Sequence, residues 1–246
     1  MKYQKKLELL MNEFELINKY FSQLTKKSKS SLNLNDDIFF DKLNSMAVSV
    51  DTYNEGKHFL NFKNPELVIK KVIRSSISDL ICKGVKPKYY FLSGSGNRKA
   101  FTKTNLSKIS KSLKEEQKKY NIILGGGDTV KSSKLSFSVT SIGFSNKIIY
   151  RNRSKINDDL YVTGNLGDSF LGLLILKKKI NINKKLSTYF INQYYKPLIK
   201  YSLTDHLNKF ATSSIDLSDG LISDLEKLTN KQKNSYQLFF DEIPVS

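Results

Sequence analysis

The spacing of apolar residues along this chain switches between the period of a strand and that of a helix. Residues 46–51 (MAVSVD) form a short run that ends in a carboxylate, which predicts a buried strand. A helical pattern begins at Pro65 and continues to Lys83, where Gly84 and Pro87 follow in the order typical of a helix end. The pattern therefore predicts a strand followed by a long helix.

The same periods predict further elements on both sides of this pair. An amphipathic helix is expected before it, and residues 26–31 are expected to form a loop. Further strands are expected at residues 89–93, 122–124, 135–144, 160–163 and 236–241. Helices are expected at residues 104–120, 167–177, 186–194, 198–210 and 220–229. The amphipathic helix places apolar side chains at Leu9, Leu10, Phe14, Ile17, Tyr20 and Phe21.

Strands and helices are mixed, and the pattern restarts near Tyr150. This order predicts two domains, an α/β domain over residues 1–149 and an α+β domain over residues 150–246. No run of ~18 uninterrupted apolar residues is present, so we expect no membrane span. The single cysteine, Cys82, excludes an internal disulfide and fits a reducing cytoplasm. We interpret it as a small apolar residue on a helix.

The net charge of +18 raises the question of nucleic-acid binding. Only four of the 41 basic residues are arginine, the residue that nucleic-acid surfaces use for bidentate and stacking contacts. The sequence has no RNP, zinc or helix-turn-helix pattern. We therefore expect no nucleic-acid partner, although the basic surface favours anionic substrates such as ATP.

The positions of the aspartates carry the functional signal. Each one alone has a plain explanation, because Asp beside Gly is usually a turn or a helix cap. Asp79 is different, since it lies within an apolar helical segment where an unpaired carboxylate is costly. Carboxylates at the ends of separate elements are the ligands that several Mg²⁺ ions need when they bridge phosphates. The aspartates in question are Asp36, Asp37, Asp51, Asp79, Asp128, Asp216 and Asp219.

Three glycines precede Asp128 and permit a close backbone approach to a bulky anion. The chain has neither the P-loop pattern nor the motifs of protein kinases. Its two histidines, His58 and His206, lack the spacing of metal ligands.

Seven motifs in order resemble the bacterial thiamine-monophosphate kinase family over nearly the whole chain. They are NEFELINKYF, NDD (35–37), VSVDT with GKHF (48–59), SISDLICKGVKP (76–87), GGGDTV (125–130), RNRSKINDDLYVTGNLGDSFLGL (151–173) and IDLSDGLISDL (215–225). The resemblance implies a two-domain PurM-like (aminoimidazole ribonucleotide synthetase-like) architecture, α/β plus α+β, and a homodimer formed through the N-terminal sheet. Cytoplasmic thiamine monophosphate and ATP would be its substrates.

By the same resemblance, several residues receive expected roles. Gly127, Asp128, Arg151 and Ser218 would contact ATP, and His58 would contact the substrate. Ser49 would join the carboxylates as a metal ligand. The Mg²⁺ ligands would be Asp37, Ser49, Asp51, Asp79, Asp128, Asp216 and Asp219.

The chain departs from the family pattern at a few places. Asn35 replaces the glycine of GDD, and we expect asparagine to tolerate a positive φ there. Val50 and Val130 replace threonines. The chain also stops at Ser246, before the family's GGEDYEL-like segment. We therefore expect an incomplete second domain, and a chain that binds Mg-ATP but turns over thiamine monophosphate poorly.

The reaction that the resemblance implies is transfer of the γ-phosphoryl group of ATP to the phosphate of thiamine monophosphate. No general base is required, because the nucleophile is already an anionic oxygen. Selenophosphate synthetase would need a reactive N-terminal cysteine, which is absent, and aminoimidazole ribonucleotide synthetase has different motifs. A non-catalytic nucleotide-binding remnant of the superfamily remains an alternative.

Overall fold

The computed structural model describes residues 13–246, so Leu9 and Leu10 of the expected amphipathic helix lie outside it. The described end of that segment is helical: α1 (Glu13–Leu16) continues into a π-turn (Ile17–Phe21) and a 3₁₀ turn (Ser22–Thr25).

A second 3₁₀ segment, Lys29–Leu34, leads to the NDD motif. Its left-handed residues are Leu32, Asn33 and Leu34, with φ of 49°, 56° and 53°. Asn35 itself has φ −122°, so the turn forms without a positive φ at Asn35. The reversal is made by the three residues before it, so no glycine is required at position 35.

A six-stranded mixed sheet forms the centre of the molecule, with the order β1-β2-β6-β3-β4 and β5 also paired with β3. β2, β6 and β3 are antiparallel neighbours, whereas β4 and β5 run parallel to β3. The expected strands at residues 46–51, 89–93, 122–124 and 135–144 are confirmed, and the short strands β1 and β5 were not expected. The strands are β1 (Phe39–Asp41), β2 (Met46–Asn54), β3 (Pro87–Gly96), β4 (Ile123–Gly126), β5 (Thr129–Lys131) and β6 (Ser136–Phe144).

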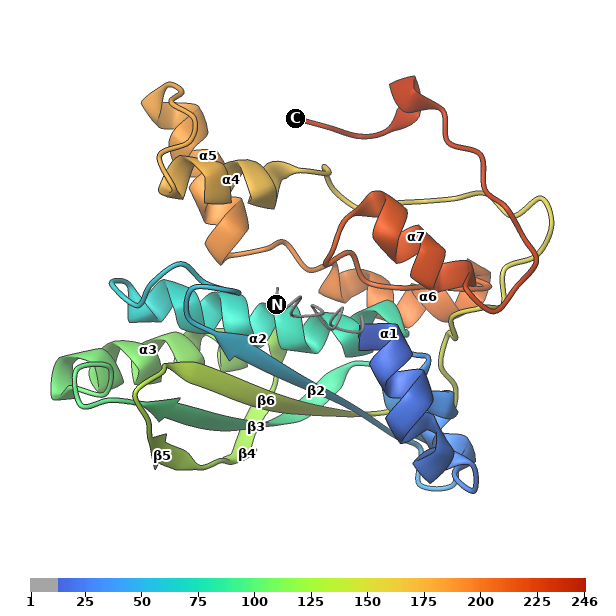
Figure 1. Cartoon of the computed structure of the whole chain (residues 1–246), viewed down its shortest axis with the longest axis horizontal. Coiled ribbons are helices and arrows are strands. Elements are labelled where there is room, and N and C mark those ends of the chain that lie inside the picture. The colour runs from blue at the N-terminus through green and yellow to red at the C-terminus, as the bar shows by residue number, and fades with distance from the viewer. Residues whose placement is uncertain (1–12) are drawn as a thin grey trace, which may run out of the picture.

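Two long helices, α2 (Pro65–Cys82) and α3 (Lys103–Tyr120), cover one face of this sheet (Figure 1). Both lie where the sequence predicts them. The apolar residues of α2 recur every three or four positions and are fully buried, as at Val68, Val72 and Ile73. Arg74 of α2 forms a bidentate ion pair with Glu116 of α3, at 2.8 and 3.0 Å, which locks the two helices together.

No helix covers the other face of the sheet in the part of the chain that Figure 1 draws as ribbon. Side chains alternate along each strand, so every second residue of β2, β3 and β6 points to this face. Among them, Val50, Phe91 and Phe144 are 68%, 40% and 51% exposed. The sheet therefore presents exposed apolar side chains on the face opposite its helical layer.

The second half of the chain packs above α2 (Figure 1) and is made of helices and loops. The expected helices at residues 167–177, 186–194 and 220–229 are confirmed. The helix expected at 198–210 is shorter, because a 3₁₀ turn (Tyr201–Leu203) forms first and the α-helix begins only at Thr204. The helices are α4 (Asp168–Leu176), α5 (Lys184–Tyr195), α6 (Thr204–Phe210) and α7 (Leu221–Thr229).

The strands expected at residues 160–163 and 236–241 are wrong. Tyr161 is 82% exposed in an irregular segment, and a 3₁₀ turn, Phe240–Glu242, replaces the end of the second expected strand. A strand forms only where a neighbour accepts its hydrogen bonds. Among the described residues after β6, the only ladder contact is an isolated bridge between Leu166 and Val245.

Candidate active site

Half-buried carboxylates from three elements meet where the second half of the chain packs onto α2. Asp51 lies in β2, Asp79 in α2 and Asp216 in the loop between α6 and α7. Burial raises the pKa of Asp79 well above its usual range, and the charges of Asp216 and Asp51 raise it further. Burial also raises the pKa values of Asp51 and Asp216. We call these three residues the carboxylate cluster.

Ser49 lies two residues before Asp51 on the same face of β2, and its hydroxyl donates to the carbonyl of Ser76 at 3.2 Å. Tyr53, on the same face, donates from its hydroxyl to Asp51 at 3.2 Å and accepts from the hydroxyl of Ser76 at 3.0 Å. Alternation along β2 thus orders three polar side chains against α2.

Two further carboxylates, Asp36 and Asp37, lie beside the carboxylate cluster and are paired with the side chains of Lys83 and Arg151. The ammonium of Lys83 lies 2.7 Å from Asp36 Oδ1 and 2.8 Å from Asp37 Oδ2. Arg151 forms an ion pair with Asp37, and its backbone N–H donates to Asp36 at 3.0 Å. Burial lowers the pKa of the Arg151 guanidinium. The predicted nucleotide-binding Arg151 is therefore already held next to the predicted metal ligand Asp37.

Cys82 borders the same region and is not a plain core residue. Its Sγ and one oxygen each of Asp37 and Asp216 all lie within 4.8 Å of one another. The thiol is half-buried and donates to the carbonyl of Asp79 at 3.1 Å. Burial raises the pKa of this thiol well above its usual value, so the group is neutral.

Two other predicted ligands lie apart from the carboxylate cluster. Asp128 is exposed, and its side chain accepts from the N–H of Thr129 at 2.7 Å. Asp219 is 65% exposed and pairs with Lys227 at 2.5 Å. Within residues 13–246, neither side chain forms a hydrogen bond or an ion pair with the carboxylate cluster. Gly127 lies against β3, where a Cβ atom would stand 1.8 Å from the carbonyl oxygen of Leu92, so backbone packing alone requires glycine there.

The loop that carries Asp216, Ser218 and Asp219 is fixed by a residue to which the sequence assigned no role. Asp224, 1% exposed, accepts from the backbone N–H groups of Ser218, Asp219 and Gly220 at 2.9, 3.0 and 3.1 Å. Lys227 also donates to it, at 2.9 Å. Asp224 lies four, five and six positions after the three residues it holds, and an acidic residue in the first turn of a helix that follows SDG is the sequence signal for this contact.

His58 lies at the end of β2 next to Tyr53, with ring centroids 5.7 Å apart. Its Nδ1 accepts from the N–H of Asn54 at 2.9 Å, and burial followed by the charges of Lys57 and Lys71 lowers its pKa. Lys71 on α2 stands 3.7 Å from the ring centroid of Tyr194, and burial lowers its pKa to about 8. A neutral imidazole and a partly buried ammonium therefore lie near each other.

Sequence analysis did not single out Lys83, which pairs with Asp36 and Asp37, or Lys71, which lies over the ring of Tyr194. Lys83, the C-cap residue of α2, follows Asp79 by four positions, about one helical turn, and Lys71 lies within α2 eight positions before Asp79. This spacing was the available signal. It was hidden by the many other lysines of a strongly basic chain.

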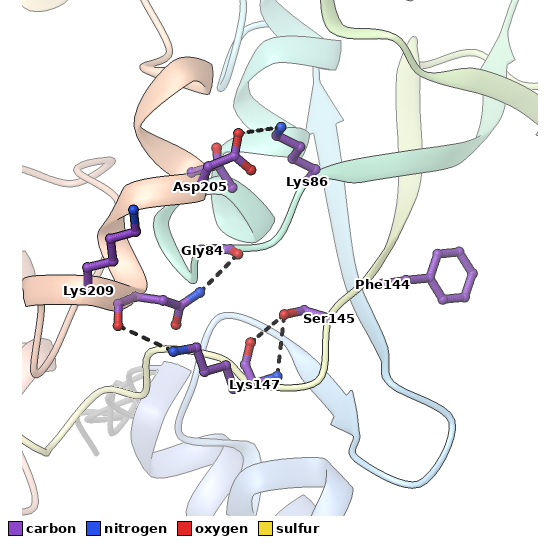
Figure 2. A pocket seen from close by; sticks show the side chains of 9 residues that line it. Gly84, Lys86, Phe144, Ser145, Lys147, Asp205 and Lys209 are labelled. Carbon is purple, nitrogen blue, oxygen red and sulfur yellow. Dashed lines mark hydrogen bonds and ion pairs between the residues drawn. The ribbon is translucent and has the colours of Figure 1, made fainter.

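A separate surface cavity of about 330 Å³ lies beside the α2–β3 connection and contains none of the clustered carboxylates. Lys86 pairs with Asp205 there, 2.5 Å away (Figure 2). The Asn208 amide donates to the Gly84 carbonyl at 3.3 Å. The cavity is the seam between the sheet and α6.

Comparisons with known proteins agree with this geometry. The AIR synthase related protein family, N-terminal domain, matches residues 35–145. A thiamine-monophosphate kinase of Buchnera aphidicola from Acyrthosiphon pisum is 38% identical over 244 residues, which are 95% of this chain and 74% of the relative. The chain belongs to the thiamine-monophosphate kinase family. A second member, from Haemophilus influenzae, is 34% identical over 97% of this chain and 74% of its own length.

A solved structure described as AaThiL complexed with AMPPCP and TMP superposes with a TM-score of 0.80. It is 28% identical to this thiamine-monophosphate kinase family member and covers 89% of this chain and 70% of that one. The expected PurM-like architecture is therefore confirmed. No helix among the described residues is long and apolar enough to cross a membrane.

Proposed function

We propose that this chain transfers the γ-phosphoryl group of ATP to thiamine monophosphate and so forms thiamine diphosphate and ADP. The observation that carries the proposal is the carboxylate cluster, Asp51, Asp79 and Asp216, built from β2, α2 and the second half of the chain. The family relationship supplies the substrates, because the AaThiL structure holds AMPPCP, an ATP analogue, together with TMP. Shared family membership and superposable fold support the same reaction here.

The carboxylate cluster fits magnesium. Its side chains offer hard oxygen donors. Burial raises the pKa values of all three, and neighbouring carboxylates raise those of Asp79 and Asp216 further, so a cation placed among them would be favoured. We propose Asp51, Asp79 and Asp216 as the main ligands, with Ser49 and Asp37 beside them. Bound Mg²⁺ would screen the phosphate charges that must approach each other. We keep Asp128 and Asp219 as proposed ligands. Because they lie apart from the carboxylate cluster, they would bind Mg²⁺ ions that are also held by the phosphates of the bound substrates.

The chain's own residues have mostly a positioning task. A non-bridging oxygen of the thiamine monophosphate phosphate attacks the γ-phosphorus, a new P–O–P bridge forms, and the bond to the β-phosphate oxygen breaks as ADP leaves. The nucleophile is an anion, so no proton is removed and no base is needed. We propose that Arg151 and the backbone around Gly127 and Ser218 hold ATP, and that His58 contacts the acceptor. Holding two anions in line then supplies much of the rate.

We also propose that two copies of the chain associate through the uncovered face of the sheet. The exposed side chains of Val50, Phe91 and Phe144 lie on this face, and the same face of a second copy would remove them from water. The Val50→Glu variant places a charge at its centre and should give a monomer by light scattering. Leu43→Glu, on the β1–β2 turn and 96% exposed, is the control that should leave the size unchanged. A monomeric parent protein would contradict this proposal.

The test of the function is ³¹P NMR of the chain incubated with ATP, thiamine monophosphate and Mg²⁺. Equal growth of the signals of ADP and thiamine diphosphate is expected, and neither should grow when thiamine monophosphate is left out. ATP binding without thiamine diphosphate formation would favour the nucleotide-binding remnant.

A further inference from the structure

The ammonium of Lys83 lies in a place that has the surroundings of a metal ion. The side chain is fully buried, and its three donors meet three oxygens: Asp36 Oδ1 at 2.7 Å, Asp37 Oδ2 at 2.8 Å and the Ser214 carbonyl at 2.7 Å. Two carboxylates and one backbone carbonyl are hard oxygen donors of the kind that Mg²⁺ takes. They come from the NDD motif and the loop that leads to Asp216.

Both carboxylates at this place are themselves nearly inaccessible, with side chains 4% and 6% exposed. Arg151 supplies a second positive group, by an ion pair with Asp37 and a backbone hydrogen bond to Asp36. Buried carboxylates need compensating charge and hydrogen bonds. At Asp36 and Asp37 the protein provides both.

We propose that Lys83 is a resident cation of the active site, which takes the place of a divalent ion at Asp36 and Asp37. It is a positioning residue: it joins α2 to the NDD loop and to Ser214, and so sets Asp37 and the Asp216 loop relative to Asp79. The inference rests on the proposed magnesium site, and it confines Mg²⁺ to the carboxylate cluster and the bound phosphates. Asp37 then reaches those ions only through oxygen lone pairs that Lys83 and Arg151 leave free.

The test replaces Lys83 by an uncharged side chain of similar length. In Lys83→Met the three oxygens lose their cation, so the variant should bind one more Mn²⁺ per chain than the parent in the presence of AMPPCP. Electron paramagnetic resonance of free Mn²⁺ gives that count. The metal-free variant should melt below the parent, and Mg²⁺, but not K⁺, should raise its melting temperature more than it raises that of the parent. The matched control is Lys86→Met on the same connection (Figure 2), with a side chain 45% exposed, which should alter neither quantity.

An unchanged Mn²⁺ count together with a lower melting temperature that Mg²⁺ does not restore would make Lys83 merely structural and overturn the proposal. If Lys83→Met does not fold, Asp36→Asn decides, since it keeps the ammonium and should keep the parent's ion count. Loss of an ion in Asp36→Asn would place a metal where we place the lysine. The parent's own ion count tests the proposed magnesium site, so failure there is distinguishable from failure of this inference.

Discussion

Asp224 accepts a hydrogen bond from the backbone N–H of Ser218 at 2.9 Å, and the same carboxylate oxygen holds the next two N–H groups of the loop. This one side chain gives the Asp216 loop its shape. Asp224→Ala should cost about 1–3 kcal/mol of unfolding free energy, because it leaves buried donors without an acceptor. It should also weaken ATP binding. Calorimetry and a nucleotide titration would measure both effects.

The control for Asp224 is Asp205→Ala, which removes only an exposed ion pair with Lys86 and should cost less than about 1 kcal/mol. Equal effects of the two substitutions would mean that the Asp224 cap does not hold the loop.

In the metal-free protein, the contribution of the carboxylate cluster to the free energy of unfolding should fall as the pH rises toward neutrality. Burial first, and then neighbouring carboxylates, raise the folded-state pKa values of Asp79 and Asp216 above the value of about 4 of an unfolded chain. Groups with a raised pKa bind protons more tightly when folded, so their contribution is complete below the unfolded pKa and is lost as the pH passes the folded pKa. Each unit of such a rise corresponds to about 1.4 kcal/mol.

Bound Mg²⁺ should reverse this trend, because it takes the deprotonated carboxylates. Melting curves with a chelator and with Mg²⁺, at about pH 5 and about pH 7.5, compare the two slopes. Parallel curves under both conditions would show that these carboxylates do not bind the ion.

The ion pair between Arg74 and Glu116 should be the main polar contribution to the packing of α2 on α3. Glu116→Ala leaves a buried guanidinium without its partner and should cost about 3–5 kcal/mol. Its neighbour Glu115 pairs with Lys70 at 2.5 Å but is 47% exposed, so Glu115→Ala should cost less than about 1 kcal/mol. Urea unfolding of the two variants makes the comparison, and similar midpoints would contradict the assignment.

Removing the guanidinium of Arg151 should weaken ATP binding. Arg151→Ala deletes a cation next to Asp37, so the KM for ATP should rise about tenfold or more while Mg²⁺ still stabilises the fold. Arg153→Ala is the control, since that guanidinium stacks on Tyr150 at 4.2 Å. An unchanged KM in Arg151→Ala would leave Arg151 as a structural residue of the NDD loop.

The first half of the fold could be predicted from the sequence because its elements carry strong local signals. Pro65 and Gly84 bound α2, and alternation marks β2 and β6. The second half was harder, since a run such as residues 160–163 has the composition of a strand but finds no pairing partner in the described structure. Whether a neighbouring strand exists is decided by tertiary structure, which local spacing does not contain.

In the candidate site, too, some residues could be predicted from local sequence and others only from the tertiary structure. Asp79 could be found from one sequence, because a carboxylate in an apolar helix face demands an explanation. The spacing of Lys83 from Asp79, and of Asp224 from the SDG motif, was present in the sequence. What these side chains hold there is set by the fold, above all the contact of Lys83 with the NDD motif. Distances across the chain, such as that from Lys83 to Ser214, come only from the three-dimensional structure.

The most direct test of the account is the rate of thiamine diphosphate formation by Asp79→Asn beside the parent chain, at the same Mg²⁺ and ATP concentrations. Asparagine keeps the shape of the side chain but removes a charge that burial and two neighbouring carboxylates oppose. The metal-free variant should therefore be as stable as the parent or more so, and turnover should fall by about a hundredfold or more, which is ~2.7 kcal/mol of transition-state stabilisation. Turnover that persists, or a sharp fall in metal-free stability, would contradict a metal-binding role for the carboxylate cluster.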